Sequence, residues 1–142
     1  MTASLTSTGS TAAVIVTHQR AELLRASLEQ VVHQTHPVQW VVVVDNGAED
    51  AVRELVESMA GDRGVYVPSE TNLGGAGGFA LGFLTALSLG ADAVWCADDD
   101  GRPADHAVLA ELYRVAEANR LHEVSPAVCN IDDPGRLAFP LR

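Results

Sequence analysis

The chain contains no lysine, and its nine positively charged residues are all arginines. Because it also contains 19 acidic residues, its formal net charge is −10. An acidic surface without a basic stripe argues against nucleic acid as a partner. Long apolar runs are also absent, because none approaches the roughly 18 residues that a membrane span requires. The first residues, MTASLTSTGSTAA, lack the basic and apolar regions of a secretion signal. These absences predict a cytoplasmic protein.

Cysteine is scarce as well, with Cys96 and Cys129 as the two instances. Their number and spacing do not support a disulfide framework, so we expect buried, reduced thiols. At 142 residues and 47% hydrophobic content the chain is long and apolar enough for one domain with its own core. We expect residues 1–11 to form a flexible Ser/Thr-rich tail and residues 12–142 to form the domain.

Short β-branched runs alternate with segments of helical periodicity along the chain. The runs predict strands at 12–17, 40–45, 64–67 and 92–97. Apolar residues at helical spacing predict helices at about 20–34, 51–60, 74–90 and 104–119. We expect the third helix to be buried because it is apolar on nearly all sides, and EVSPAVCN to begin a fifth strand. This order predicts an α/β fold, with a Rossmann-like, mostly parallel sheet covered by helices on both faces.

Polar residues follow each predicted strand. They are Thr17, His18 and Arg20 after the first, Asp45 and Asn46 after the second, Asn72 after the third, and Asp98, Asp99 and Asp100 after the fourth. Ligands of such sheets bind at the carboxyl ends of the strands. We therefore expect all four groups to line one edge of the sheet.

The three consecutive aspartates in WCADDDGRP have two interpretations. Alternation along a strand would put Asp98 and Asp100 on one side and Asp99 on the other, which makes a pair of carboxylates suited to Mg²⁺ or Mn²⁺. The alternative is a solvated acidic turn that caps a helix starting near Pro103. The triplet alone favours neither.

The glycines of NLGGAGGF have three interpretations. They could let the backbone approach an anionic ligand at a helix N-terminus, or they could only permit close packing of helix on sheet. Gly75, Gly77 and Ala80 also satisfy the G-x-G-x-x-A pattern of dinucleotide-binding proteins. The glycines lie about seven residues past the preceding strand, however, and two strand-helix units come before them, which argues against that third interpretation.

Two further residues carry a functional and a neutral interpretation. Asp45 could accept hydrogen bonds from a ribose or base, or it could belong to a plain Asn-Gly turn. Arg20 could pair with a phosphate, or it could be a solvated arginine at a helix start.

Taken together and in this order, VIVTHQR, VVVVDNG, TNLGGAGGF and WCADDDGRP resemble the nucleotide-sugar-binding half of family 2 glycosyltransferases with the GT-A fold. Within that family, the chain looks most like bacterial galactofuranosyltransferases of mycobacterial galactan synthesis. The resemblance covers roughly residues 12–140, and it implies that residues 12–142 are the donor-binding part of a GT-A domain whose acceptor half is missing. It also implies a sheet that stops after the fourth or fifth strand.

The resemblance implies an inverting, metal-dependent transfer of galactofuranose from UDP-galactofuranose to a lipid-linked cell-wall acceptor sugar. Asp98 and Asp100 would hold Mn²⁺ or Mg²⁺. The donor-binding residues it implies are Thr17, His18, Arg20, Asp45, Asn72, Gly74, Gly75 and Asp99. The expected partners are a UDP-sugar and a glycan or glycolipid acceptor, with peripheral association at the inner face of the plasma membrane.

No residue of the chain matches the general base of such enzymes, so we expect that base downstream of Arg142. One alternative is accordingly a non-catalytic nucleotide-sugar-binding fragment. Another, from the glycine pattern, is a dinucleotide-binding oxidoreductase domain.

Overall fold

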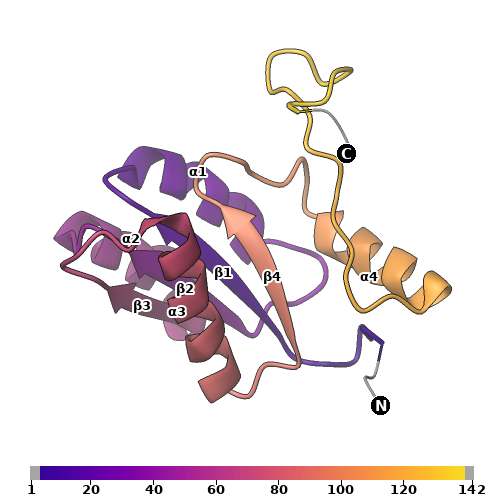
Figure 1. Cartoon of the computed structure of the whole chain (residues 1–142), viewed down its shortest axis with the longest axis horizontal. Coiled ribbons are helices and arrows are strands. Elements are labelled where there is room, and N and C mark those ends of the chain that lie inside the picture. Colours follow the sequence, from indigo (N-terminus) through magenta and orange to yellow (C-terminus); the bar gives the residue numbers. More distant parts are fainter. Residues whose placement is uncertain (1–3, 140–142) are drawn as a thin grey trace.

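Strands and helices alternate through residues 4–139, which are the residues that the computed structural model describes. The elements are β1 (Thr11–Thr17), α1 (Ala21–Val32), β2 (Trp40–Asp45), α2 (Asp50–Ala60), the 3₁₀ turn η1 (Gly61–Arg63), β3 (Gly64–Pro68), α3 (Gly74–Ser88), β4 (Ala93–Asp98) and α4 (Val108–Asn119). The strands form one parallel sheet in the order β3-β2-β1-β4 (Figure 1). The predicted parallel α/β sheet is therefore confirmed.

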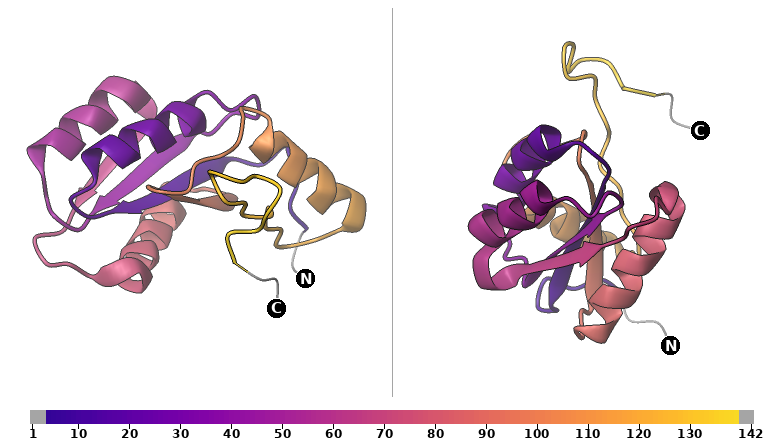
Figure 2. Two further views of the ribbon diagram at one scale, coloured as in Figure 1. Left: turned by 90° about the horizontal axis from the view of Figure 1, so that it is seen from above. Right: turned by 90° about the vertical axis from the view of Figure 1, so that its left-hand side faces the viewer.

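Helices cover both faces of the sheet, with α1 and α2 on one side and α3 on the other (Figure 2). Successive residues of a strand point to opposite faces, so β1 and β2 contribute to two separate cores. The core beneath α1 and α2 contains Ala13, Ile15, Val41 and Val43, and the core beneath α3 contains Ala12, Val14, Val42 and Val44. A strand covered on both faces has to be apolar without alternation, which is the pattern of WVVVVD.

Glycines let α3 lie close to the sheet. A Cβ at Gly78 would come within 2.5 Å of Val16 Cγ1, and one at Gly82 within 2.3 Å of Val14 Cγ1. Phe79 and Leu81 of α3 are partly buried against the core on this face, whereas Leu84 and Leu87 point outward and are 65% and 66% exposed. The prediction of a buried helix is therefore wrong for the outward face of α3, because its fully buried positions are Gly78, Gly82 and Ala86.

Helix α4 begins later than predicted, at Val108 and not near residue 104. Its start is fixed from another element: Gln34, just after α1, accepts a hydrogen bond on Oε1 from the backbone N–H of Leu109 at 2.9 Å. Asp105 accepts the N–H of Ala107 at 2.8 Å. These two side chains satisfy N–H groups at the start of α4 that would otherwise lack partners.

The predicted fifth strand does not form within residues 4–139, where Cys129 makes only a single antiparallel bridge with Leu137. Both cysteines are free, as predicted, but they are exposed and not buried. Cys96 lies on β4, which is an edge strand of the sheet and therefore lacks a neighbour on one side.

Residues 4–11, which belong to the predicted N-terminal tail, contact later parts of the chain. The amide of Leu5 donates to the carbonyl of Leu121 at 3.0 Å, Ser7 donates to Glu117 through both its amide and its hydroxyl, and Ser10 donates to Asp92 in the same way. Residues 1–3 lie outside the described residues. Among the helices that are described, none combines the length and the apolar character needed to cross a membrane.

The close approach of α3 to β1 predicts the effect of adding one methyl group. Gly82→Ala should lower the free energy of unfolding by about 1–3 kcal/mol, since the new Cβ meets a fully buried Val14 that has no room to move. Gly75→Ala is the matched control, because its Cβ would meet nothing within 4 Å, and it should leave stability unchanged or raise it by up to about 1 kcal/mol. Urea denaturation measures both. Equal effects of the two substitutions would contradict the packing described.

Candidate functional site

The parallel pairing of β1 with its two neighbours brings the predicted polar residues to one edge of the sheet. Thr17 is paired with Asp45 of β2, and the preceding residue, Val16, is paired with Asp98 of β4. The carboxyl ends of β1, β2 and β4 therefore meet at the same level. The N-terminus of α3 joins them, because Asn46 donates through Nδ2 to the carbonyl of Gly74 at 3.2 Å.

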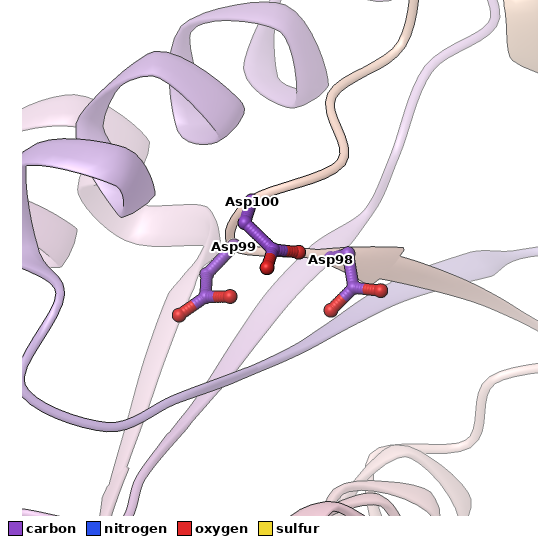
Figure 3. A group of neighbouring side chains, drawn as sticks. All are labelled: Asp98, Asp99 and Asp100. Carbon is purple, nitrogen blue, oxygen red and sulfur yellow. The ribbon is translucent and has the colours of Figure 1, made fainter. Parts of the chain in front are cut away.

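The three aspartates form a cluster at the end of β4 (Figure 3). Each offers one carboxylate oxygen, and these oxygens lie within 4.8 Å of one another. Asp99 is buried while Asp98 and Asp100 are exposed. The burial of the three side chains therefore alternates, as predicted. The carboxylate of Asp99 nevertheless belongs to the same group as the other two and does not point away from them, because β4 ends at Asp98.

Asp99 is fixed by residues of β1 and of the loop that follows. Its Oδ2 accepts a hydrogen bond from Thr17 Oγ1 at 2.9 Å, and its Oδ1 lies 3.5 Å from Arg20 Nη1. The same Arg20 nitrogen lies 3.1 Å from Asp100 Oδ2. Three of the residues predicted to act together, Thr17, Arg20 and Asp99, are therefore in direct contact.

Asp98 is the member of the cluster with the least favourable surroundings. Partial burial, followed by the charges of Asp100 and Asp99, raises the pKa of its carboxyl above the usual value. Helix capping does not explain the charges, because α4 starts at Val108 and the N–H groups of Ala107 and Leu109 at its start are accepted by Asp105 and Gln34. Three carboxylates share one half-exposed arginine, and oxygen ligands of this kind suit Mg²⁺ or Mn²⁺. The residues present therefore fit a divalent cation.

Asp45 is fully buried, at 0% exposure. Its Oδ1 accepts the backbone N–H of Gly47 at 2.9 Å, and its Oδ2 accepts the N–H of Glu49 at 2.7 Å and the hydroxyl of Tyr66 at 2.9 Å. This aspartate holds the loop between β2 and α2 in place, as expected if it belongs to a turn. Its predicted contact with a nucleoside remains a prediction.

The glycines of the segment NLGGAGGF have different structural roles. Gly74, at the start of α3, has a φ of +68°, a conformation that favours glycine, and its amide donates to Asn72 Oδ1 at 2.9 Å. Gly75 is exposed, and a Cβ added there would meet nothing within 4 Å, so a ligand could approach its backbone. Gly75 and Gly77 lie inside α3, not in the first turn after β3, which departs from the arrangement of a dinucleotide-binding loop.

Two buried polar atoms at this edge have no hydrogen-bond partner among the described residues. They are Nδ1 of His18, a predicted donor-binding residue, and Oε2 of Glu49. Sequence reasoning did not single out Glu49. It also missed Ser27, whose hydroxyl donates to the carbonyl of Asp98 at 2.6 Å. The sequence does contain an indication of this role, because Ser27 is a polar residue on the apolar, buried face of α1 between Leu24 and Leu28.

Comparison with known proteins gives consistent results. Residues 12–140 match the family Glycosyl transferase family 2. The chain is 56% identical over 138 residues to the galactofuranosyltransferase GlfT1 of Mycolicibacterium smegmatis, which covers 97% of this chain and 45% of that protein. It is also 56% identical over 137 residues to GlfT1 of Mycobacterium tuberculosis H37Rv, with 95% and 45% covered. The chain thus spans about half the length of the curated relatives it matches.

Two solved structures share the fold at lower identity. A mannosyltransferase from Pyrobaculum calidifontis in complex with GDP-Man and Mn²⁺ superposes with a TM-score of 0.60, 22% identity and coverage of 88% of this chain and 37% of that one. TarS of S. aureus in complex with UDP gives a TM-score of 0.62 and 20% identity, with 78% and 33% covered. These likenesses support the predicted GT-A fold.

The raised pKa of Asp98 predicts a pH-dependent stability. Because its pKa is raised in the folded state, ionised Asp98 destabilises the fold; this effect is absent near pH 3, appears as the pH rises through the folded-state pKa and is complete at neutral pH. Asp98→Asn should therefore raise the melting temperature at pH 7 by about 1–4 °C, at the lower end for an exposed group. The gain should vanish towards pH 3. Calorimetric melting over this range is the measurement.

Asp62→Asn is the control for this prediction, since it removes the same charge from an exposed residue outside the cluster. It should not reproduce the stabilisation at pH 7. A lower melting temperature for Asp98→Asn at pH 7, or a gain that persists at pH 3, would show that the surroundings of Asp98 do not disfavour its charged form as described.

Proposed function

The chain belongs to glycosyl transferase family 2, and on that premise we propose that the carboxyl edge of its sheet binds a nucleotide-sugar donor together with a divalent cation. The observation that carries the proposal is the cluster of Asp98, Asp99 and Asp100 beside Thr17 and Arg20. A cluster of carboxylates short of positive charge favours a cation, and a diphosphate brings further oxygen ligands for it. Family membership also favours this function over the dinucleotide-binding alternative.

In this proposal Asp98 and Asp100, the exposed members of the cluster, hold Mn²⁺ or Mg²⁺. When bound, the cation supplies Lewis-acid stabilisation of the negative charge on a departing diphosphate. Asp99, anchored by Thr17, keeps the segment after β4 in position and faces the sugar. Arg20 has a side chain that is 51% exposed, so its guanidinium can reach phosphate oxygens from its present place beside the cluster.

The remaining donor contacts come from the neighbouring loops. Asp45 at the end of β2 recognises the uridine, and His18 offers the buried Nδ1 that has no partner in the described part of the chain. Asn72, Gly74 and Gly75 bring the N-terminus of α3 towards the donor, where backbone amides and the helix dipole favour an anion.

We further propose that the donor is UDP-galactofuranose and that the acceptor is a lipid-linked cell-wall sugar, with inversion at the transferred carbon. Support comes from the two mycobacterial galactofuranosyltransferases, which are 56% identical to the chain. The chain spans 45% of each of them, so we assign the complete transfer to a longer protein. In this proposal the general base, the acceptor site and any contact to the cytoplasmic face of the membrane correspond to the part of the relatives that this chain does not match.

Metal-dependent binding of UDP tests the proposed site. Isothermal titration of the chain with UDP should show binding in the presence of Mn²⁺ or Mg²⁺ and none in excess EDTA. Combining Asp98→Asn with Asp100→Asn should weaken UDP binding at least tenfold, which is about 1.4 kcal/mol, because the cation loses its two exposed ligands.

The matched control combines Asp132→Asn with Asp133→Asn, which removes two neighbouring charges from an exposed turn outside the site. UDP affinity should stay at the wild-type value in this variant. Equal UDP affinity with and without the metal would rule out the carboxylate cluster as a cation site.

The identity of the sugar is tested by competition. UDP-galactofuranose should displace a fluorescent UDP derivative from the metal-loaded chain at lower concentration than UDP-galactopyranose, because the two differ only in the ring form of the sugar. The purified chain should bind both without transferring sugar to an acceptor. A preference for the pyranose form would argue for a different donor.

A further inference from the structure

The hydroxyl of Tyr66 lies against the carboxylate of Asp45. Tyr66 is in the middle of β3, paired with Val43 of β2, and its partly buried ring packs on the core beneath α1 and α2. Its hydroxyl donates to Asp45 Oδ2 at 2.9 Å. Burial, followed by the hydrogen bond and the charge of Asp45, raises the pKa of Tyr66 to about 12. The hydroxyl therefore keeps its proton at neutral pH and acts as a donor to Asp45.

The contacts of Asp45 leave one acceptor position unused. Oδ2 receives two hydrogen bonds, from Tyr66 and from the amide of Glu49, whereas Oδ1 receives one, from the amide of Gly47. A carboxylate oxygen has two lone pairs, so Oδ2 is saturated and Oδ1 can accept once more. Among the donors within residues 4–139, Tyr66 is the one that reaches Asp45 through a side chain.

A second unused acceptor lies beside the first. The buried Oε2 of Glu49 has no hydrogen-bond partner among the described residues. A Cβ built on Gly47 would lie 3.4 Å from this atom and 3.4 Å from Asp45 Oδ1. Two buried acceptor oxygens therefore lie near the place where Gly47 lacks a side chain, and N–H or O–H donors of a ligand would complete their hydrogen bonds.

We propose that Tyr66 is a positioning residue for nucleoside recognition: its hydroxyl orients Asp45 so that Oδ1 meets an N–H or O–H group of the bound nucleotide. The proposal rests on the function proposed above, in which Asp45 recognises the nucleoside. Without the hydroxyl, Oδ2 would have one donor less, and the carboxylate could rotate away from the orientation that its backbone donors allow.

Tyr66→Phe tests the proposal, because it keeps the ring and its packing and removes only the hydroxyl. Two ligands are titrated in the presence of Mn²⁺: UDP, which has a nucleoside, and inorganic diphosphate, which has none. Tyr66→Phe should weaken UDP binding by about threefold to tenfold, as expected for one hydrogen bond. Its affinity for inorganic diphosphate should equal that of the wild type.

Tyr113→Phe is the matched control. It also removes a buried tyrosine hydroxyl, one that lies 2.6 Å from Thr11 Oγ1 at the opposite end of β1, and it should change neither affinity. A double-mutant cycle adds a second readout: Asp45→Asn should weaken UDP binding by itself, and Tyr66→Phe should have no further effect in that background, because Tyr66 acts through Asp45.

The possible negative results can be told apart by the affinities that are measured. UDP binding unchanged by Tyr66→Phe would overturn the inference and leave the proposed function standing. Equal weakening of UDP and inorganic diphosphate, or additive losses in the cycle, would also overturn it, because a purely structural role predicts both. If the wild type with Mn²⁺ binds UDP no more tightly than inorganic diphosphate, the nucleoside does not contribute to affinity. Asp45 would then not recognise the nucleoside, and the inference about Tyr66 would be wrong as well.

Discussion

The parallel pairing of β1 with β4 is the contact on which the rest of the site depends. It places Asp98 beside Val16, and this register brings the following residue, Asp99, to the hydroxyl of Thr17. Helix α1 secures the same point from the other side, since Ser27 donates to the Asp98 carbonyl. A shift of one residue in this register would exchange the inward and outward side chains of β4. It would bring Asp98 or Asp100 to Thr17 and break up the carboxylate cluster.

The glycines of α3 and the loop after β2 connect the second half of the edge to the first. Gly78 and Gly82 set how closely α3 approaches β1, because any side chain there would collide with Val16 or Val14. Asn46 then ties the start of α3 to the end of β2 by accepting the amide of Leu73 and donating to the carbonyl of Gly74. The packing and ligand-approach interpretations of the glycines are therefore compatible, since they concern different residues of one segment.

The sequence was sufficient for the strand order along the chain and for the edge at which the polar residues meet, because both follow from apolar runs and the parallel topology. It was insufficient where distant parts of the chain decide the outcome. The start of α4 depends on Gln34, which precedes its partner Leu109 by 75 residues. The residues before β1 are held by Leu121 and Glu117, and no local pattern reports such contacts. The segment GVYV predicts a strand for Tyr66, but nothing in it indicates that the tyrosine hydroxyl reaches Asp45.

Asp45 and Asp98 lie on the same edge of the sheet but have different surroundings, and the difference suits them to different proposed roles. Asp45 is enclosed and receives three hydrogen bonds, so its orientation is set before any ligand arrives and it suits the recognition of a fixed group. Asp98 is partly exposed, and its partial burial, followed by the negative charges of Asp100 and Asp99, raises its pKa. That repulsion is unfavourable in the free protein, but a divalent cation would convert it into attraction, because each carboxylate that destabilises its neighbours would then help to hold the ion. In the proposed function, cation binding would therefore recover the free energy that is lost when the three carboxylates are brought together.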